Sequence, residues 1–345
     1  MSTTSAPRIG VMGAGAIGSY VGACLLADGF DVALVGRPSG RDEVREHGLR
    51  ITDYTGREHK LSAAQVSFST DASGVKGTRF VLVTVKGLAT ESAGKEMAPH
   101  LDPDAVVVSL QNGVQNPDVL RRTLGSRRVL AAMVPFNVVR QGPGRYHRGT
   151  SGALVIEATP DGVEAPLVEA LNRSGVETVA LKNVLEVQWG KLLLNLNNAL
   201  NALAGVPLLE QISDRAYRLV LAASMSEALS LLRAARIRPE TNVALPASAV
   251  PWLLRMPTPV FSRVASKLMA IDPQARSSMW EDLERRRRTE IDLLNGEIVA
   301  LARRLGRRAP VNERIVQLVG DAERAGAGSP RMSADALARE VRYAR

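Results

Sequence analysis

The sequence has one cysteine, four histidines and few aromatic residues, and these shortages exclude several classes of protein. Because Cys24 is the only cysteine, no intramolecular disulfide can form, which excludes a small secreted domain held together by disulfides. The histidines lie far apart in the sequence and none has a cysteine at metal-ligand spacing, so we expect no metal site. They are His47, His59, His100 and His147.

We also expect neither a transmembrane segment nor a secretory signal. The long uncharged stretch 192–209 contains Pro207 and several asparagines, which are costly in hydrocarbon. The N-terminus has no basic start followed by an apolar run. We therefore expect a cytoplasmic protein with no membrane partner.

The net charge of +9 does not by itself indicate a nucleic-acid partner. Arginine clusters such as 285–288 are dispersed along the chain and mixed with acids, and no aromatic residues alternate with them. No DNA- or RNA-binding motif is recognisable. A solvated surface with a general attraction for anions is the simpler interpretation, so we expect no nucleic acid.

In the first half of the chain, short β-rich runs alternate with amphipathic helical stretches, a pattern that is typical of a parallel sheet covered by helices. A further segment, 146–156, contains Gly149 and Gly152 and predicts a hairpin appended to that sheet. The predicted strands are 8–12, 31–35, 79–85, 105–110, 128–134 and 176–181, and the predicted helices are 16–28, 88–99, 116–124 and 161–173.

After about Lys182 only helical patterns remain, and 345 residues suit two domains. We therefore predict an α/β protein with an N-terminal Rossmann-type doubly wound parallel sheet in 1–182 and an all-helical domain in 183–345. The apolar helix faces of the second domain suit either a homodimer or an intramolecular core. The predicted helices of this half are 184–204, 213–236, 260–270, 277–305 and 310–324.

A glycine-rich motif lies between the first predicted strand and the first predicted helix. Gly13 allows a tight turn, Gly15 lets the backbone approach a pyrophosphate, and Gly18 lets the helix pack on the strand. The start of the helix also favours an anion. The alternative is a glycine-rich turn that binds nothing. The motif reads Gly13-Ala14-Gly15-Ala16-Ile17-Gly18.

The end of the second strand indicates which dinucleotide is bound. An NAD enzyme carries Asp or Glu there, against the ribose hydroxyls, whereas this sequence reads Val35-Gly36-Arg37. A guanidinium at this place suits the 2′-phosphate of NADP(H). The alternative is an exposed loop arginine without a function.

Two further polar residues stand where parallel strands end, which is the ligand-binding edge of such a sheet. Lys86 follows the strand 79–85, and Asn112 follows the strand 105–110. Each alone is compatible with ordinary turn chemistry. Their joint placement indicates a ligand site.

On the first helix of the second half, Lys191 and Asn195 are four residues apart and share one face. An ammonium beside a carbonyl oxygen can stabilise developing negative charge and supply a proton during hydride transfer. The alternative is structural: Lys191 extends to solvent along the helix start, and Asn195 satisfies a buried backbone group.

A second polar segment begins at Ser277-Ser278, where either serine suits a helix N-cap. Hydroxyl and backbone donors together could bind a carboxylate there. Glu290 lies twelve residues beyond Ser278, about 18 Å along a straight helix. Both cannot touch one small substrate unless the helix bends, so Glu290 is expected to serve the cofactor side.

Together these residues resemble the ketopantoate reductase family across nearly the whole chain. Six features in the right order are far more specific than any one of them. They are Gly13-x-Gly15-x-x-Gly18, Lys86, Gln111-Asn112-Gly113, Trp189-x-Lys191-x-x-x-Asn195, Ser277-Ser278-Met279, and Thr289-Glu290-Ile291-Asp292 followed by Asn295-Gly296.

The resemblance implies NADPH-dependent reduction of 2-dehydropantoate (ketopantoate), a small 2-oxo acid, to pantoate in a cleft between the domains. It implies that Lys191 is the general acid to the keto oxygen and that Asn112 and Asn195 orient the substrate. It further implies that Ser278 binds the substrate carboxylate, while Lys86 and Glu290 support the cofactor.

Three places depart from the family pattern. The lysine helix continues as Asn198 to Ala202, with Ala199, where the family usually has Asn-Pro-Leu-Thr-Ala. Leu208-Leu209-Glu210 replaces Asn-Gly-Glu, and Ala275 stands where an asparagine is often found. Since these positions help to hold the substrate in the family, another 2-oxo acid is an alternative substrate.

Other classes of function remain alternatives. One is a different NADP enzyme with a helical second domain, of the β-hydroxyacid or opine dehydrogenase type, which also carries lysine and asparagine on its central helix. Another is a non-catalytic NADP-binding module that senses redox state or binds a partner. The Lys191, Asn195 and Ser278 set favours an enzyme.

Overall fold

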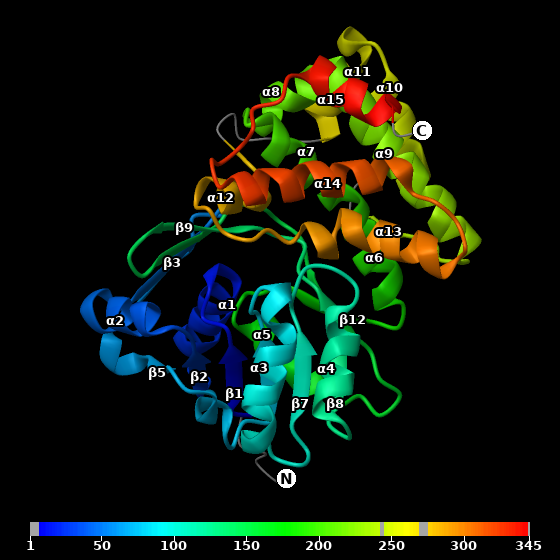
Figure 1. Cartoon of the computed structure of the whole chain (residues 1–345). Helices are drawn as coiled ribbons and strands as arrows, with labels where there is room; N and C mark the ends of the chain where they lie inside the picture. Colours follow the sequence, from blue (N-terminus) through cyan, green and yellow to red (C-terminus); the bar gives the residue numbers. More distant parts are fainter. Residues whose placement is uncertain (1–6, 242–244, 269–274, 344–345) are drawn as a thin grey trace. The chain divides into compact units, whose positions relative to one another are not determined.

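The computed structural model describes residues 7–241, 245–268 and 275–343, and the chain divides into two compact units, Met1–Leu185 and Glu186–Arg345. The first unit contains the sheets and the second is helical (Figure 1). The predicted fold class is therefore confirmed. The described residues contain no helix that is long and apolar enough to cross a membrane.

In the described part of the first unit, the main sheet has eight strands in the order β12-β11-β8-β7-β6-β1-β2-β5. Its strands are parallel to their neighbours, except that β11 runs antiparallel to β8. The six predicted strands are all present. The strands are β1 (Ile9–Met12), β2 (Val32–Val35), β5 (Ser67–Ser69), β6 (Phe80–Val83), β7 (Val106–Ser109), β8 (Arg128–Met133), β11 (Leu154–Glu157) and β12 (Thr178–Leu181).

Alternate side chains of the central strands enter two different cores, one on each face of the sheet. Val11 packs with residues of α1 and α5, whereas Met12 packs with residues of α3 and α4. Helices therefore cover both faces, as in a doubly wound fold. They are α1 (Ala16–Ala27), α3 (Thr90–Met97), α4 (Asn116–Leu124) and α5 (Ala165–Arg173).

A second sheet of the first unit has the order β4-β3-β10-β9. The predicted hairpin at 146–156 is wrong, because its two strands join different sheets: β10 pairs with β9, and β11 pairs with β8. Gly152 has φ of 121°, and a Cβ there would lie 2.8 Å from Pro135 Cγ, so glycine lets the chain pass this proline. The strands are β3 (Leu49–Asp53), β4 (Glu58–Leu61), β9 (Val138–Gly142) and β10 (Arg145–Arg148).

Two long helices predicted for the second unit are each interrupted. The segment 184–204 forms α6 (Val184–Asn195) and α7 (Asn197–Ala204). The single helix predicted for 277–305 is wrong: α12 ends at Glu284, and α13 begins at Asn295. Arg286, with φ of 53°, stands in the left-handed region, which an α-helix cannot continue through.

Four helices were not predicted: α2 (Pro38–His47), α8 (Leu208–Ser213), α10 (Val250–Arg255) and α15 (Ala334–Tyr343). The tail that forms α15 is highly charged, but Leu337 and Val341 are buried where this helix packs against α9. Burial of this narrow apolar face explains the helix. The other helices of the second unit are α9 (Arg215–Ala234), α11 (Thr258–Leu268), α12 (Ser278–Glu284), α13 (Asn295–Arg304) and α14 (Pro310–Ala325).

Candidate active site

The loops that follow β1, β2, β6 and β7 share one edge of the main sheet, because these strands are parallel neighbours in the order β7-β6-β1-β2. Neighbouring strands lie about 4.8 Å apart, so the loops are close together. The strand order changes direction at β1, where doubly wound folds bind their ligands. The loops carry the glycine motif, Arg37, Lys86 and Asn112.

The glycine motif has the backbone that close approach to a phosphate requires. Gly13 has φ of 113°, and a Cβ there would lie 2.6 Å from the Val85 nitrogen. A Cβ on Gly18 would lie 2.4 Å from the Gly13 carbonyl oxygen. Gly15, by contrast, is exposed, and no atom lies within 4 Å of its ideal Cβ position. It begins α1 without a side-chain cap, so the first-turn N–H groups remain accessible to a ligand.

Arg37 is the residue before α2 and is exposed, and the structure shows no ion pair between it and another described residue. Its guanidinium is therefore available for an anion at the end of β2. Lys86 is also exposed, at the start of a short 3-10 turn after β6, and its carbonyl oxygen accepts from the Ala89 nitrogen. Both cationic side chains thus lie in loops at the same edge of the main sheet as the glycine motif.

The loop with Asn112 is held by a buried network that sequence reasoning did not assign. Gln111 Nε2 donates to the Val85 carbonyl at 3.0 Å and to Thr90 Oγ1 at 2.6 Å. Asn116 Nδ2 donates to the Asn112 carbonyl at 2.6 Å. The only sequence signal was the Gln-Asn-Gly motif. The network ties the loop after β6 to the loop after β7 and so positions Asn112.

In the second unit, Lys191 is half-buried on α6. Burial lowers the pKa of its ammonium to about 8, and the nearby carboxylate of Glu290 opposes this shift. A lysine in this range is still mostly protonated at neutral pH and can transfer its proton readily. Asn195, at the end of the same helix, is also half-buried.

The interruption after α12 changes the expected distance between Glu290 and the rest of the site. With the helix ended at Glu284, the estimate along one straight helix no longer applies. The Thr289 nitrogen donates to Glu323 Oε1 at 2.7 Å, which fixes the chain just before Glu290. The charge of Glu290, the next residue, acts on Lys191.

The two serines at the start of α12 have different roles. Ser277 is the N-cap: its Oγ accepts from the Trp280 nitrogen at 3.1 Å, and the residue is buried. Its own nitrogen donates to Oδ1 of the fully buried Asn201 at 2.8 Å. Ser278 is exposed and is not needed as a cap. Its hydroxyl is thus the one that could bind a ligand.

Gly190, next to Lys191, is a further positioning residue that sequence reasoning missed. A Cβ at Gly190 would lie 1.7 Å from the Glu240 carbonyl oxygen, so the backbone around Glu240 packs directly on α6. The Glu240 nitrogen also donates to the Glu186 carbonyl at 3.0 Å. No sequence pattern connects these segments.

Two of the three departures from the family pattern lie side by side. The Leu208 nitrogen donates to the Ala275 carbonyl at 2.9 Å, and Leu209 is 41% exposed. Arg276 Nη1 donates to the Gly205 carbonyl at 2.6 Å and strengthens the same contact. The residues before Ser278 therefore adjoin Leu208 and Leu209.

Comparison with known proteins decides the family. Residues 9–161 match the model of the ketopantoate reductase PanE/ApbA domain, and residues 183–323 match that of its C-terminal domain. The chain belongs to the PanE/ApbA ketopantoate reductase family. The family predicted from the motifs is thereby confirmed, and it is a family of oxidoreductases.

Similar proteins span nearly the whole chain. A PanE/ApbA family ketopantoate reductase from Ralstonia eutropha JMP134 has a crystal structure with a TM-score of 0.79 and 34% identity, over 92% of this chain and 99% of that one. The 2-dehydropantoate 2-reductase of Pyrococcus horikoshii is 28% identical, over 93% of this chain and 99% of that protein. The one from Halobacterium salinarum is 29% identical, over 92% and 100%.

Proposed function

We propose that the protein reduces 2-dehydropantoate to pantoate with NADPH, a step of pantothenate and coenzyme A biosynthesis. The observation that carries the proposal is Lys191, whose pKa is lowered to about 8 by burial opposite Glu290. This is the expected state of a general acid at neutral pH. Family membership and the names of the similar proteins support the reaction.

The residues at the edge of the main sheet fit a dinucleotide. The open space at Gly15 and the uncapped start of α1, with no acidic residue in its first turn, suit a pyrophosphate. The motif from Gly13 to Gly18 would hold it through backbone N–H groups, and the exposed Arg37 would bind the 2′-phosphate of NADP(H). When bound, the nicotinamide supplies the hydride. Lys86 and Glu290 would support the cofactor.

Four polar residues would bind the substrate and supply the proton. Ser278 would bind the carboxylate of the 2-oxo acid, and Asn112 and Asn195 would orient it by hydrogen bonds. As hydride reaches the keto carbon, negative charge develops on the keto oxygen. Lys191 Nζ stabilises that charge and transfers its proton to the oxygen, so the lysine ends the step neutral.

Both the charge and the position of Glu290 matter for this chemistry. Its negative charge favours the protonated form of Lys191 and so keeps the acid charged although it is half-buried. It also stands at the start of a 3-10 turn, Ile291–Leu293, held at Thr289 by Glu323. We propose that Glu290 is therefore part of the catalytic group.

A related 2-oxo acid is the second candidate substrate. The hydrogen bond between Leu208 and Ala275 places an apolar segment beside the residues that lead to Ser278. A substrate whose far end is apolar would gain from this surface. This alternative changes the substrate but keeps Lys191 and Ser278 in the same roles.

The test is an absorbance assay of NADPH oxidation with ketopantoate beside a panel of 2-oxo acids with apolar side chains, repeated with NADH. We expect ketopantoate and NADPH to give the highest kcat/KM. A higher value for an apolar 2-oxo acid would select the second candidate. Tight NADPH binding without turnover of any 2-oxo acid would contradict both and favour a binding module.

A further inference from the structure

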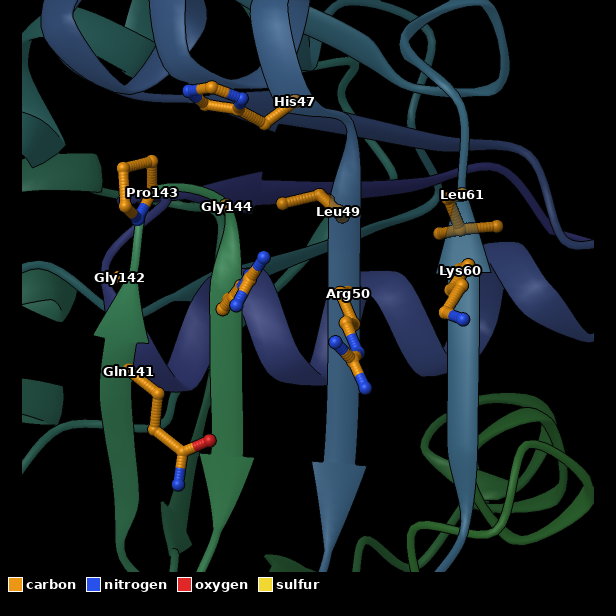
Figure 2. A pocket seen from close by; sticks show the side chains of 10 residues that line it. His47, Leu49, Arg50, Lys60, Leu61, Gln141, Gly142, Pro143 and Gly144 are labelled. Carbon is orange, nitrogen blue, oxygen red and sulfur yellow. The ribbon is translucent and has the colours of Figure 1, made fainter.

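The second sheet of the first unit has a concave pocket on the face away from α1 (Figure 2). The pocket has a volume of about 520 Å³, within the range of small-molecule sites. None of the described residues that line it is acidic. Its charged and polar lining residues are His47, Arg50, Lys60, Gln141 and Arg145.

Three of these side chains form a row across adjacent strands. Arg50 on β3 is directly opposite Lys60 on β4 and directly opposite Arg145 on β10. Like charges in directly opposed positions destabilise a sheet. A row of like charges attracts an anion, and a bound anion would offset the repulsion between its members.

An anionic oxygen already contacts one end of the row. Oε1 of Glu58 lies 2.9 Å from Arg50 Nε and 3.1 Å from Lys60 Nζ, and these two contacts hold the pKa of the Glu58 carboxyl below its usual value. Two cations of the row thus converge on a single oxygen. For Arg145, the described residues provide no such ion pair.

The wall of the pocket is rigid backbone. Gly144 and Gly48 have positive φ, and a Cβ on Gly144 would lie 2.4 Å from the Gly48 carbonyl oxygen. The Arg50 nitrogen donates to the Gly144 carbonyl at 2.8 Å. A β-bulge between Arg145 and Tyr146 turns the strand at the pocket. The site is therefore preformed, which lowers the entropic cost of binding.

We propose that this pocket binds a small molecule with two or more phosphate groups. Three neighbouring strands span roughly 10 Å, so one phosphate cannot reach the whole row. The site is separate from the dinucleotide edge: α2 starts next to Arg37 and ends at His47, and its ten residues span roughly 15 Å.

The test uses the full chain and inorganic tripolyphosphate in isothermal titration calorimetry. We expect saturable binding of one molecule per chain, weakened at least tenfold in the double variant Arg50→Gln/Arg145→Gln. Glu58→Gln removes the competing carboxylate, so it should tighten binding several-fold. The matched control is Arg79→Gln/Arg128→Gln, because these arginines pair with Asp104 and Asp161 outside the pocket.

Arg37→Gln separates this pocket from the dinucleotide edge. Retained tripolyphosphate binding in Arg37→Gln supports the proposal. Loss of binding in Arg37→Gln together with retention in the Arg50/Arg145 variant would overturn it, as would non-saturable binding or equal binding by all variants. Thermal unfolding provides an independent check: tripolyphosphate should raise the melting temperature of the wild type but not that of the Arg50/Arg145 variant. An equal rise in both proteins would contradict the proposal.

Discussion

The carboxylate of Glu290 acts on the ammonium of Lys191 and opposes the burial that lowers the lysine pKa to about 8. Lys191 lies in α6, whereas Glu290 lies between α12 and α13, just before the 3-10 turn Ile291–Leu293. The acid strength of Lys191 therefore depends on the charge of a residue outside its own helix.

The first prediction concerns pH. Lys191 is protonated below its pKa of about 8, so kcat for ketopantoate reduction should fall as pH rises above about 8. Glu290→Gln removes the charge that favours the protonated form, so this fall should move to lower pH. The measurement is a pH profile of kcat for both proteins. An unchanged profile in the variant would contradict the coupling of the two residues.

The second prediction concerns the choice of dinucleotide. Because Arg37 is proposed to bind the 2′-phosphate, Arg37→Gln should raise KM for NADPH by about 10- to 100-fold, as expected for the loss of a charge-assisted hydrogen bond. KM for NADH should change little. Arg41→Gln is the control, since Arg41 pairs with Asp42. Equal increases in KM for NADPH and NADH would show that Arg37 does not bind the 2′-phosphate.

The third prediction separates the two serines. Ser277→Ala removes the N-cap of α12 and should cost about 1 kcal/mol of unfolding free energy. Ser278→Ala should leave stability unchanged but raise KM for the 2-oxo acid. Chemical denaturation and steady-state kinetics measure the two effects. If Ser278→Ala alters stability and not KM, the carboxylate has another partner.

The fourth prediction concerns Gly190. A methyl group there collides with the Glu240 carbonyl, so Gly190→Ala should shift α6, lower the unfolding free energy by about 1–3 kcal/mol and reduce kcat. Gly320→Ala is the control, because that glycine lies in α14 near only the flexible end of Arg324. Full activity of Gly190→Ala would mean that the position of Lys191 does not depend on this contact.

Much of the first unit was predictable because the local sequence patterns indicate the same strands and helices that the main sheet contains. Buried apolar runs mark the central strands, and the glycine motif lies between β1 and α1 as expected. The hairpin prediction failed because neighbouring strands in sequence joined different sheets, and hydrophobic alternation does not indicate a pairing partner.

The sites were harder to predict in the second unit. The break at Arg286 carries no glycine or proline signal, so periodicity favoured one long helix. The contact of Gly190 with Glu240 and the hydrogen bond of Ser277 with Asn201 join segments far apart in the chain. Such contacts follow from tertiary packing and leave no local pattern.

We propose above that Lys191 is the general acid in ketopantoate reduction. The most direct test is NADPH-dependent turnover of ketopantoate by Lys191→Ala. Lys182→Ala is the control, because Lys182 is an exposed lysine just before α6. The account predicts that kcat falls at least 100-fold in Lys191→Ala, as expected for loss of a general acid, and is unchanged in Lys182→Ala. Wild-type turnover in Lys191→Ala would contradict it.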